Sequence, residues 1–171
     1  MVNAIIKIGA KKGSNHVTMR DLAKECNVST FKIIDFFATK KAYLDYAVQS
    51  IDVPYMEKAF KLVDSGLSNI EIFNVLLDDF LLEPDKALFY LSYTNDFGFD
   101  PTTNNERQET FLKIAKVFFK DRDYIDDDHI LLCWDYITSM LFYYSEKIIH
   151  GYIENNEKNR NWINGIVFNG I

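Results

Sequence analysis

The stretch of residues 18–44 constrains the fold of this chain most, because three helix-start signals stand close together in it. Thr18 precedes an apolar-periodic run, and Asp21 follows three residues later, where a carboxylate favours the positive end of a helix. Ser29 and Thr39 occupy the same kind of position before two further apolar runs. The sequence therefore predicts two short helices and the start of a third.

The connection between the first two of these helices is too short for an antiparallel pair. Asn27 is expected to end the first helix, since asparagine tolerates the left-handed backbone conformation that a sharp turn requires. The small side chain of Ala23 lets the helices cross closely, and Val28 and Ile33 fill the angle between them. This arrangement predicts a helix-turn-helix unit, which a preceding helix over residues 2–12 completes as a three-helix module.

This part of the chain resembles the DNA-binding segment of the TetR family of bacterial transcriptional regulators. The positions that fall on the family pattern, in order, are Gly13, Thr18, Leu22, Ala23, Val28, Ser29, Ile33, Phe37, Thr39, Lys40 and Leu44. The resemblance covers only the first third of the chain. It implies an all-α fold, in which the N-terminal helix-turn-helix module is followed by a helical-bundle domain for ligand binding and dimerisation. It also implies a repressor that binds a palindromic operator as a homodimer and is released by a small-molecule effector.

We therefore expect residues 1–47 to be the DNA-binding domain and residues 48–171 to be the effector-binding and dimerisation domain. Residues 1–47 contain eight Lys and Arg against four Asp and Glu, a balance of +4. The whole chain has 19 basic and 25 acidic residues and a net charge of −6, so the remainder holds 11 and 21, a balance of −10. A basic module on an acidic body suits a protein of which one end approaches phosphates.

The predicted DNA contacts come from the helix-turn-helix module. Phosphates are expected to be held through hydroxyl groups, cations or helix-start N–H groups of Thr18, Arg20, Ser29, Lys32 and Lys40. The side chains expected to face base edges are Thr30, Lys32, Asp35 and Phe36. The phenylalanine among them is able to touch a thymine methyl group.

Three departures from the family pattern leave the DNA-binding role open. Phe31 and Lys32 replace the usual Gly-Thr pair, Ile34 replaces a tyrosine that contacts a backbone phosphate, and Asp35 adds an acid. An apolar side chain cannot donate to phosphate and a carboxylate repels it, although Asp35 could accept a hydrogen bond from cytosine N4. The first alternative is therefore a TetR-like homodimer with lost or atypical DNA binding that acts through protein contacts.

The next helices link the module to the body. Pro54 lies inside the apolar pattern of residues 40–62, so we expect that helix to kink or to restart at Val53. Ser68 and Glu71 form a capping box before the following apolar helix. The resemblance implies a small molecule inside this body. Aromatic side chains with a few hydroxyl groups suit such a pocket, and ordinary core packing is the alternative interpretation of the same residues. The residues expected to line the pocket are Tyr90, Tyr93, Phe111, Trp134 and Tyr143.

The last two helices are expected to form the dimer interface. Residues 130–152 carry apolar side chains on more than one stripe, which predicts a helix buried on two sides. A short apolar helix follows Asn155 and Asn156. A small body cannot cover both helices, and the resemblance places homodimerisation here as a four-helix bundle. The acidic run of residues 126–128 fits a helix cap better than a metal site.

Motifs for catalysis are missing from the sequence. It contains no glycine-rich nucleotide loop, zinc-protease motif, paired CxxC or nucleophile elbow. We therefore expect no enzymatic activity, no cofactor and no metal, and a helical-bundle ligand carrier or unrecognised enzyme is the second alternative. No apolar run reaches the roughly 18 residues of a bilayer span, and a signal-peptide pattern is missing, so we expect a cytoplasmic protein without a membrane partner. The expected partners are an operator duplex, a second copy and an unidentified small molecule.

Overall fold

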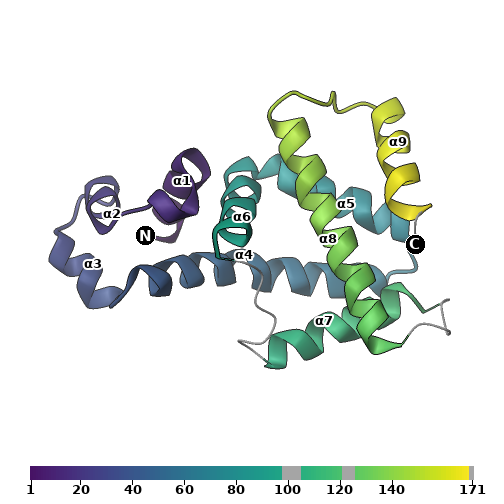
Figure 1. Cartoon of the computed structure of the whole chain (residues 1–171), viewed down its shortest axis with the longest axis horizontal. Helices are drawn as coiled ribbons and strands as arrows, with labels where there is room; N and C mark the ends of the chain where they lie inside the picture. The colour runs from purple at the N-terminus through teal and green to yellow at the C-terminus, as the bar shows by residue number, and fades with distance from the viewer. Residues whose placement is uncertain (98–104, 121–125, 170–171) are drawn as a thin grey trace. The chain divides into compact units, whose positions relative to one another are not determined.

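The computed structural model describes residues 1–97, 105–120 and 126–169, and for residues 105–108, 110 and 111 it describes the backbone only. These described residues form helices and connecting turns and contain no strand (Figure 1). The predicted all-α fold class is thereby confirmed. The elements in chain order are α1 (Val2–Lys12), the short 3-10 helix η1 (Ser14–His16), α2 (Met19–Glu25), α3 (Thr30–Phe36), α4 (Lys40–Val63), α5 (Asn69–Leu82), α6 (Pro84–Phe97), α7 (Asn105–Phe118), α8 (Asp127–Ile149) and α9 (Glu157–Phe168).

The chain divides into two compact units, and the division falls inside α4. The first unit contains α1 to α3, the N-terminal part of α4 up to Tyr55, and α6. The second unit begins at Met56 and contains the rest of α4, together with α5 and α7 to α9. These units differ from the predicted ranges 1–47 and 48–171, chiefly because α6 packs with the N-terminal helices. The functional assignment of the two ranges stays a prediction.

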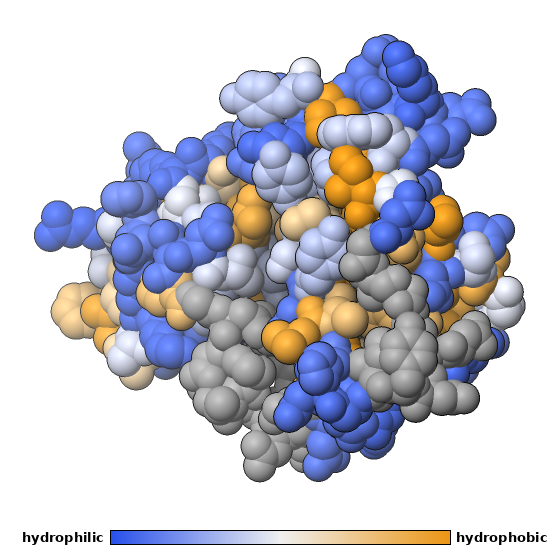
Figure 2. Space-filling model, turned by 45° about the vertical axis from the view of Figure 1, so that its right-hand side comes forward, coloured by the Kyte–Doolittle hydropathy of each residue, from blue (hydrophilic) through white to orange (hydrophobic). Residues whose placement is uncertain are grey.

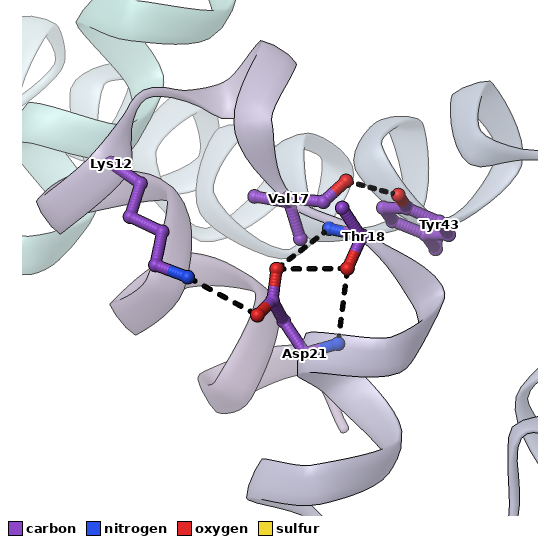
Figure 3. Close-up of polar contacts among 5 residues, drawn as sticks. All are labelled: Lys12, Val17, Thr18, Asp21 and Tyr43. Carbon is purple, nitrogen blue, oxygen red and sulfur yellow. Dashed lines mark hydrogen bonds and ion pairs between the residues drawn. The ribbon is translucent and has the colours of Figure 1, made fainter.

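The helix starts in the first unit are formed by the capping residues that the sequence indicated. The Asp21 backbone N–H donates to Thr18 Oγ1 at 3.1 Å, and the Thr18 N–H donates to Asp21 Oδ2 at 3.3 Å, which completes a capping box (Figure 3). Ser29 Oγ accepts from the Lys32 N–H at 3.3 Å and caps α3. Asn27 has a φ of 52°, so the turn between α2 and α3 uses the left-handed conformation expected of it.

Helix α6 lies directly against α1 in the core of the first unit. A Cβ atom added at Gly9 of α1 would lie 2.4 Å from Cδ2 of Phe89, whose ring is fully buried. Glycine is therefore required at this point for the two helices to approach so closely. The other fully buried apolar side chains of this unit are Ile5, Val17, Leu22, Ile33, Leu44 and Ala47.

Helix α4 continues through Pro54 as one helix of 24 residues. Of the two outcomes expected at Pro54, a restart at Val53 is therefore wrong, and a kink stays a prediction. Proline has no N–H to donate to the carbonyl of Ser50, and such a loss in a helix interior costs about 3 kcal/mol. Burial of Ile51 and Ala59 on either side of the proline offsets this cost through packing. This packing cannot be predicted from the residues next to Pro54 in the sequence.

The second unit is built on α5 and α8, with α7 and α9 packed along α8. The ring centroids of Phe80 on α5 and Phe142 on α8 lie 4.8 Å apart. Arg160 on α9 donates from Nη2 to Asp78 Oδ1 of α5 at 2.5 Å. The helices of the second unit also begin at the capping residues that the sequence indicated. Ser68 accepts from the Glu71 N–H, Asp126 from the His129 N–H, and Asn156 from the Asn159 N–H. These capping predictions are confirmed.

One face of α8 remains uncovered in the single chain, so burial of this helix on two sides stays a prediction that depends on a second copy. Leu132 is 65% exposed, and Tyr136 and Tyr143 are exposed as well. On α9, Trp162 and Ile166 are exposed. Figure 2 shows that hydrophobic residues, drawn orange, lie at the surface of the molecule among hydrophilic ones, drawn blue. Within the described part of the chain, no helix combines the length and the apolar character needed to cross a membrane.

Candidate nucleic-acid interface

Helix α3 turns one face into the first unit and the other to solvent. Ile33 is fully buried and Phe37, four residues later, is nearly so, which fixes the inner face at helical spacing. On the opposite side, Phe31 is 78% exposed and Ile34 is 45% exposed. Phe36 is also 62% exposed, so three large apolar side chains of a seven-residue helix face water.

The hydroxyl groups of the two predicted phosphate ligands Thr18 and Ser29 are used as helix caps. Thr18 Oγ1 accepts from the Asp21 N–H and donates to Asp21 Oδ2 at 2.8 Å (Figure 3). Lys12 binds the same carboxylate at 3.1 Å. The hydrogen bond from the Thr18 hydroxyl, followed by that from Lys12, lowers the pKa of Asp21. These contacts fix the start of α2. They do not involve Arg20 and Lys24, the exposed cations of the same helix.

The predicted cations differ in how they are held. Arg20 on α2 and Lys32 on α3 are exposed and make no ion pair with any described residue. Lys40, at the start of α4, instead donates from Nζ to the backbone carbonyl and, at 3.2 Å, to Oδ1 of Asn15. Arg20 and Lys32 are therefore free to approach a phosphate, whereas Lys40 ties α4 to the η1 turn.

The acidic residues of this module are mostly neutralised by lysines, which leaves a positive surface. Lys7 binds Glu25 at 2.6 Å, Lys12 binds Asp21, and Lys41 binds Asp45 at 2.6 Å. The hydrogen bond and charge of Lys7 lower the pKa of Glu25. Across residues 1–47, Asp35 is then the one acid outside an ion pair. The cations without an acidic partner there are Lys11, Arg20, Lys24, Lys32 and Lys40.

Comparison with known proteins places this geometry in a known fold. No protein-family model and no curated protein sequence matches the chain. Among solved structures, a TetR family transcription regulator from Marinobacter aquaeolei matches with a TM-score of 0.78, at 10% identity, over 98% of this chain and 91% of that one. The fold is that of the TetR family. The resemblance between residues 13–44 and this family is thus confirmed at the level of structure.

Two further structures share the TetR fold with this chain. The transcriptional regulator FadR from Bacillus subtilis, solved in complex with stearoyl-CoA, matches with a TM-score of 0.68, at 13% identity, over 99% of this chain and 97% of that one. A TetR-like transcriptional regulator from Rhodococcus sp. matches with a TM-score of 0.67, at 14% identity, over 99% and 92% of the two chains. All three neighbours are transcription regulators.

Within this TetR fold, α3 is the second helix of the helix-turn-helix unit. Lys32, Asp35 and Phe36 are exposed on it, as a role at base edges requires, and Thr30 is half-buried at its start. Phe31 is the most exposed side chain among the large apolar residues of α3, but it was missed as a candidate contact. The signal for it was present in the sequence, because Ile33 and the apolar residue four positions later define the inner face and place Phe31 outside it.

The residues of the predicted effector pocket belong to different compact units. Tyr90 and Tyr93 lie in the first unit, where Tyr90 is buried and the Tyr93 hydroxyl donates to Asp45 Oδ1 at 2.6 Å. In the second unit, Trp134 is buried in the core, while Tyr143 is exposed with Lys147 Nζ 5.1 Å from its ring centroid. The side chain of Phe111, the fifth predicted residue, lies outside the described residues. A single pocket lined by all five stays a prediction.

Proposed function

We propose that this chain is a DNA-binding transcription regulator of the TetR type, and specifically a repressor that acts as a homodimer on a palindromic operator. The single observation that carries the proposal is the surface of the helix-turn-helix unit. Helix α3 is held by its inner face, exposes its outer face and is accompanied by Arg20, Lys24 and Lys32, none of which is paired with an acid in the described chain. Unpaired cations on a helix-turn-helix unit with an exposed second helix are typical of a protein that reads the major groove.

The uncovered face of α8 and α9 supports the homodimer. Leu132, Tyr143 and Trp162 belong to the same compact unit and leave large apolar surface in water. A two-fold pair of such faces buries that surface against itself, because each copy offers the same patch. Two copies would carry two reading helices roughly 34–36 Å apart or somewhat more, which matches two half-sites one helical turn of DNA apart.

We further propose that a small molecule releases the regulator from its operator. The support comes from one neighbour of the same fold, which was solved with stearoyl-CoA. The aromatic side chains predicted to line a pocket are consistent in chemistry with an apolar ligand. The effector itself is unidentified.

Binding to DNA is tested by the salt dependence of affinity. Fluorescence anisotropy with the duplex upstream of the protein's own gene, over about 50 to 200 mM salt, is expected to show a steep fall in affinity, since each phosphate contact contributes about −0.9 to the logarithmic slope. Arg20→Ala and Lys32→Ala should each reduce the slope by about 1.8, because the dimer loses one such contact in each of its two copies. Lys61→Ala, which changes an exposed lysine of the second unit, is the matched control and should leave the slope unchanged.

A second candidate function is favoured by the apolar character of α3. Ile34 is exposed where the family pattern has a tyrosine that contacts phosphate, Phe31 is exposed where the pattern has a glycine, and Asp35 adds a negative charge beside them. A TetR-like dimer that acts through protein contacts would use such a surface without DNA. If neither the upstream duplex nor a random-sequence duplex binds at low salt, the repressor proposal fails and this candidate takes its place.

A further inference from the structure

We infer that the outer face of α3 reads the C5-methyl groups of thymines, with Phe31 and Ile34 as the side chains that determine sequence specificity. The inference rests on the proposed DNA-binding function and adds to it the chemical class of base that the surface selects. It concerns two residues that the sequence did not single out as contacts.

The geometry of α3 places these two side chains together. Residues three apart lie on the same side of a helix, so Phe31 and Ile34 are neighbours on one face. Their exposed fractions are 78% and 45%, whereas Ile33 between them is fully buried and points the other way. Neither side chain is therefore part of the buried core. A seven-residue helix that leaves them in water presents an apolar contact surface to whatever occupies its outer side.

The chemistry of the major groove offers one apolar group that fits this surface. Base edges in the groove present hydrogen-bond donors and acceptors, which an aromatic ring or an isoleucine cannot satisfy. The thymine C5-methyl group is the exception, and apolar side chains contact it directly. Asp35, one position after Ile34, is exposed and accepts hydrogen bonds only, so cytosine N4 is the base group that suits it. The expected half-site thus contains adjacent thymines beside a cytosine.

The unpaired cations of the helix-turn-helix unit favour a DNA duplex, rather than an apolar protein surface, as the partner of this apolar face. Lys32 on α3 itself, and Arg20 and Lys24 on the neighbouring α2, are exposed and have no acidic partner in the described part of the chain. Burying such cations against an apolar partner would remove their hydration without compensation. Phosphates on either side of a major groove would pair with them while the groove floor receives the apolar residues.

Replacing thymine by deoxyuridine tests the inference, because this substitution removes the C5-methyl group and keeps every hydrogen-bonding group. A tight-binding duplex is first selected from a random-sequence pool by the full-length protein, and each thymine of its half-sites is then replaced in turn. We expect affinity to fall about fourfold for each contacted methyl group, the factor that corresponds to the burial of one such group. The salt slope should not change, because no phosphate contact is lost.

Variants of α3 then show which side chains are responsible for the loss of affinity caused by deoxyuridine. In Phe31→Ala and Ile34→Ala, the sensitivity to deoxyuridine at one position should disappear, while the salt slope stays as in the parent protein. Lys32→Ala should show the reverse, a smaller salt slope with the deoxyuridine effect retained. Phe60→Ala, which shortens a 42% exposed phenylalanine of α4 in the second unit, is the control and should change neither. Circular dichroism melts of each variant establish that these surface changes leave the fold intact.

The possible failures are distinguishable. If the selected duplex binds with a steep salt dependence but deoxyuridine at every thymine leaves affinity unchanged, thymine-methyl reading is overturned and the proposed function stands. If deoxyuridine weakens binding equally in the parent protein and in both α3 variants, the assignment to Phe31 and Ile34 is overturned. If no duplex is selected at low salt, the proposed function itself fails and this inference fails with it.

Discussion

The Ser14 hydroxyl donates a hydrogen bond to the Asp96 carboxylate at 2.6 Å, and this bond joins the η1 turn to the C-terminal part of α6. The same carboxylate accepts the Asn15 N–H at 3.0 Å, and the Ser14 N–H donates to Ser92 Oγ at 2.7 Å. Helix α6 is thus fastened to the turn that leads into the helix-turn-helix unit. The positions of α2 and α3 depend on a helix far away in the sequence.

Asp96→Asn should lower the free energy of unfolding by about 1 kcal/mol, which is less than the usual contribution of a hydrogen bond to a charged group because this carboxylate is exposed. The Ser14 hydrogen bond, followed by that of Asn15, lowers the pKa of Asp96 in the folded protein. Its contribution is therefore complete above the ordinary aspartate pKa of about 4 and is lost as pH falls through the lowered value. Urea unfolding at pH 7 and pH 3 measures both effects.

The matched control for this variant is Asn95→Ala, which changes the exposed neighbour on α6. It should leave unfolding at both pH values within about 0.5 kcal/mol of the parent protein. An Asp96→Asn protein that loses as much stability on acidification as the parent would show that this carboxylate is not responsible.

Gly9→Ala should destabilise the protein by roughly 1–3 kcal/mol, because the added methyl group meets the buried ring of Phe89 at 2.4 Å. Gly165→Ala on α9 is the matched control. Its added Cβ has no neighbour closer than 3.7 Å, at Asn169 Nδ2, so the gain in helix propensity should stabilise the protein by about 0.5–1 kcal/mol. Thermal unfolding should show a lower melting temperature for Gly9→Ala and a higher one for Gly165→Ala. A change in the same direction in both variants would contradict the close approach of α1 and α6.

Tyr43→Phe should cost about 1–2 kcal/mol of unfolding free energy. The Tyr43 hydroxyl is buried and donates to the Val17 carbonyl at 2.7 Å (Figure 3), and its removal leaves that acceptor without a partner. Burial raises the pKa of Tyr43 to about 12. The folded state therefore keeps a proton that the unfolded state begins to release near pH 10, and stability declines as pH rises from there towards 12.

Denaturant unfolding between pH 8 and pH 11 measures this alkaline decline. The decline should be smaller in Tyr43→Phe than in the parent protein. Tyr46→Phe, which changes an exposed tyrosine on the same helix, should reproduce the parent profile. An unchanged profile in Tyr43→Phe would assign the alkaline loss to other groups.

Leu132→Lys should convert the proposed dimer into a monomer. Leu132 is 65% exposed on the uncovered face of α8, and a charge placed there cannot be buried against its own copy without a large desolvation cost. Leu82→Lys is the matched control, since Leu82 is 80% exposed at the end of α5 and lies outside the α8–α9 face. Sedimentation velocity over a range of protein concentrations should show a dimer for the parent and for Leu82→Lys. A parent protein that sediments as a monomer throughout would contradict the dimer.

The exposure of several candidate site residues could be predicted from residues close together in the chain. Arg20, Lys32 and Asp35 are exposed as expected, because they alternate with apolar positions at helical spacing. The use of Thr18 as a cap was also readable, but the involvement of its hydroxyl with Asp21 leaves less for a phosphate than the sequence alone indicated. Which apolar residues of α3 remain outside could be decided only once its inner face was packed.

The helix starts were determined by the sequence itself, since a cap such as Ser29, Ser68 or Asp126 needs only an N–H group three residues ahead. Tertiary structure decided the features that depend on distant partners. The passage of α4 through Pro54 and the attachment of α6 to η1 through Asp96 both rest on packing or hydrogen bonds that local signals do not encode. Burial is a property of the whole fold, so only the folded chain separates the apolar side chains of its core from those that face a partner.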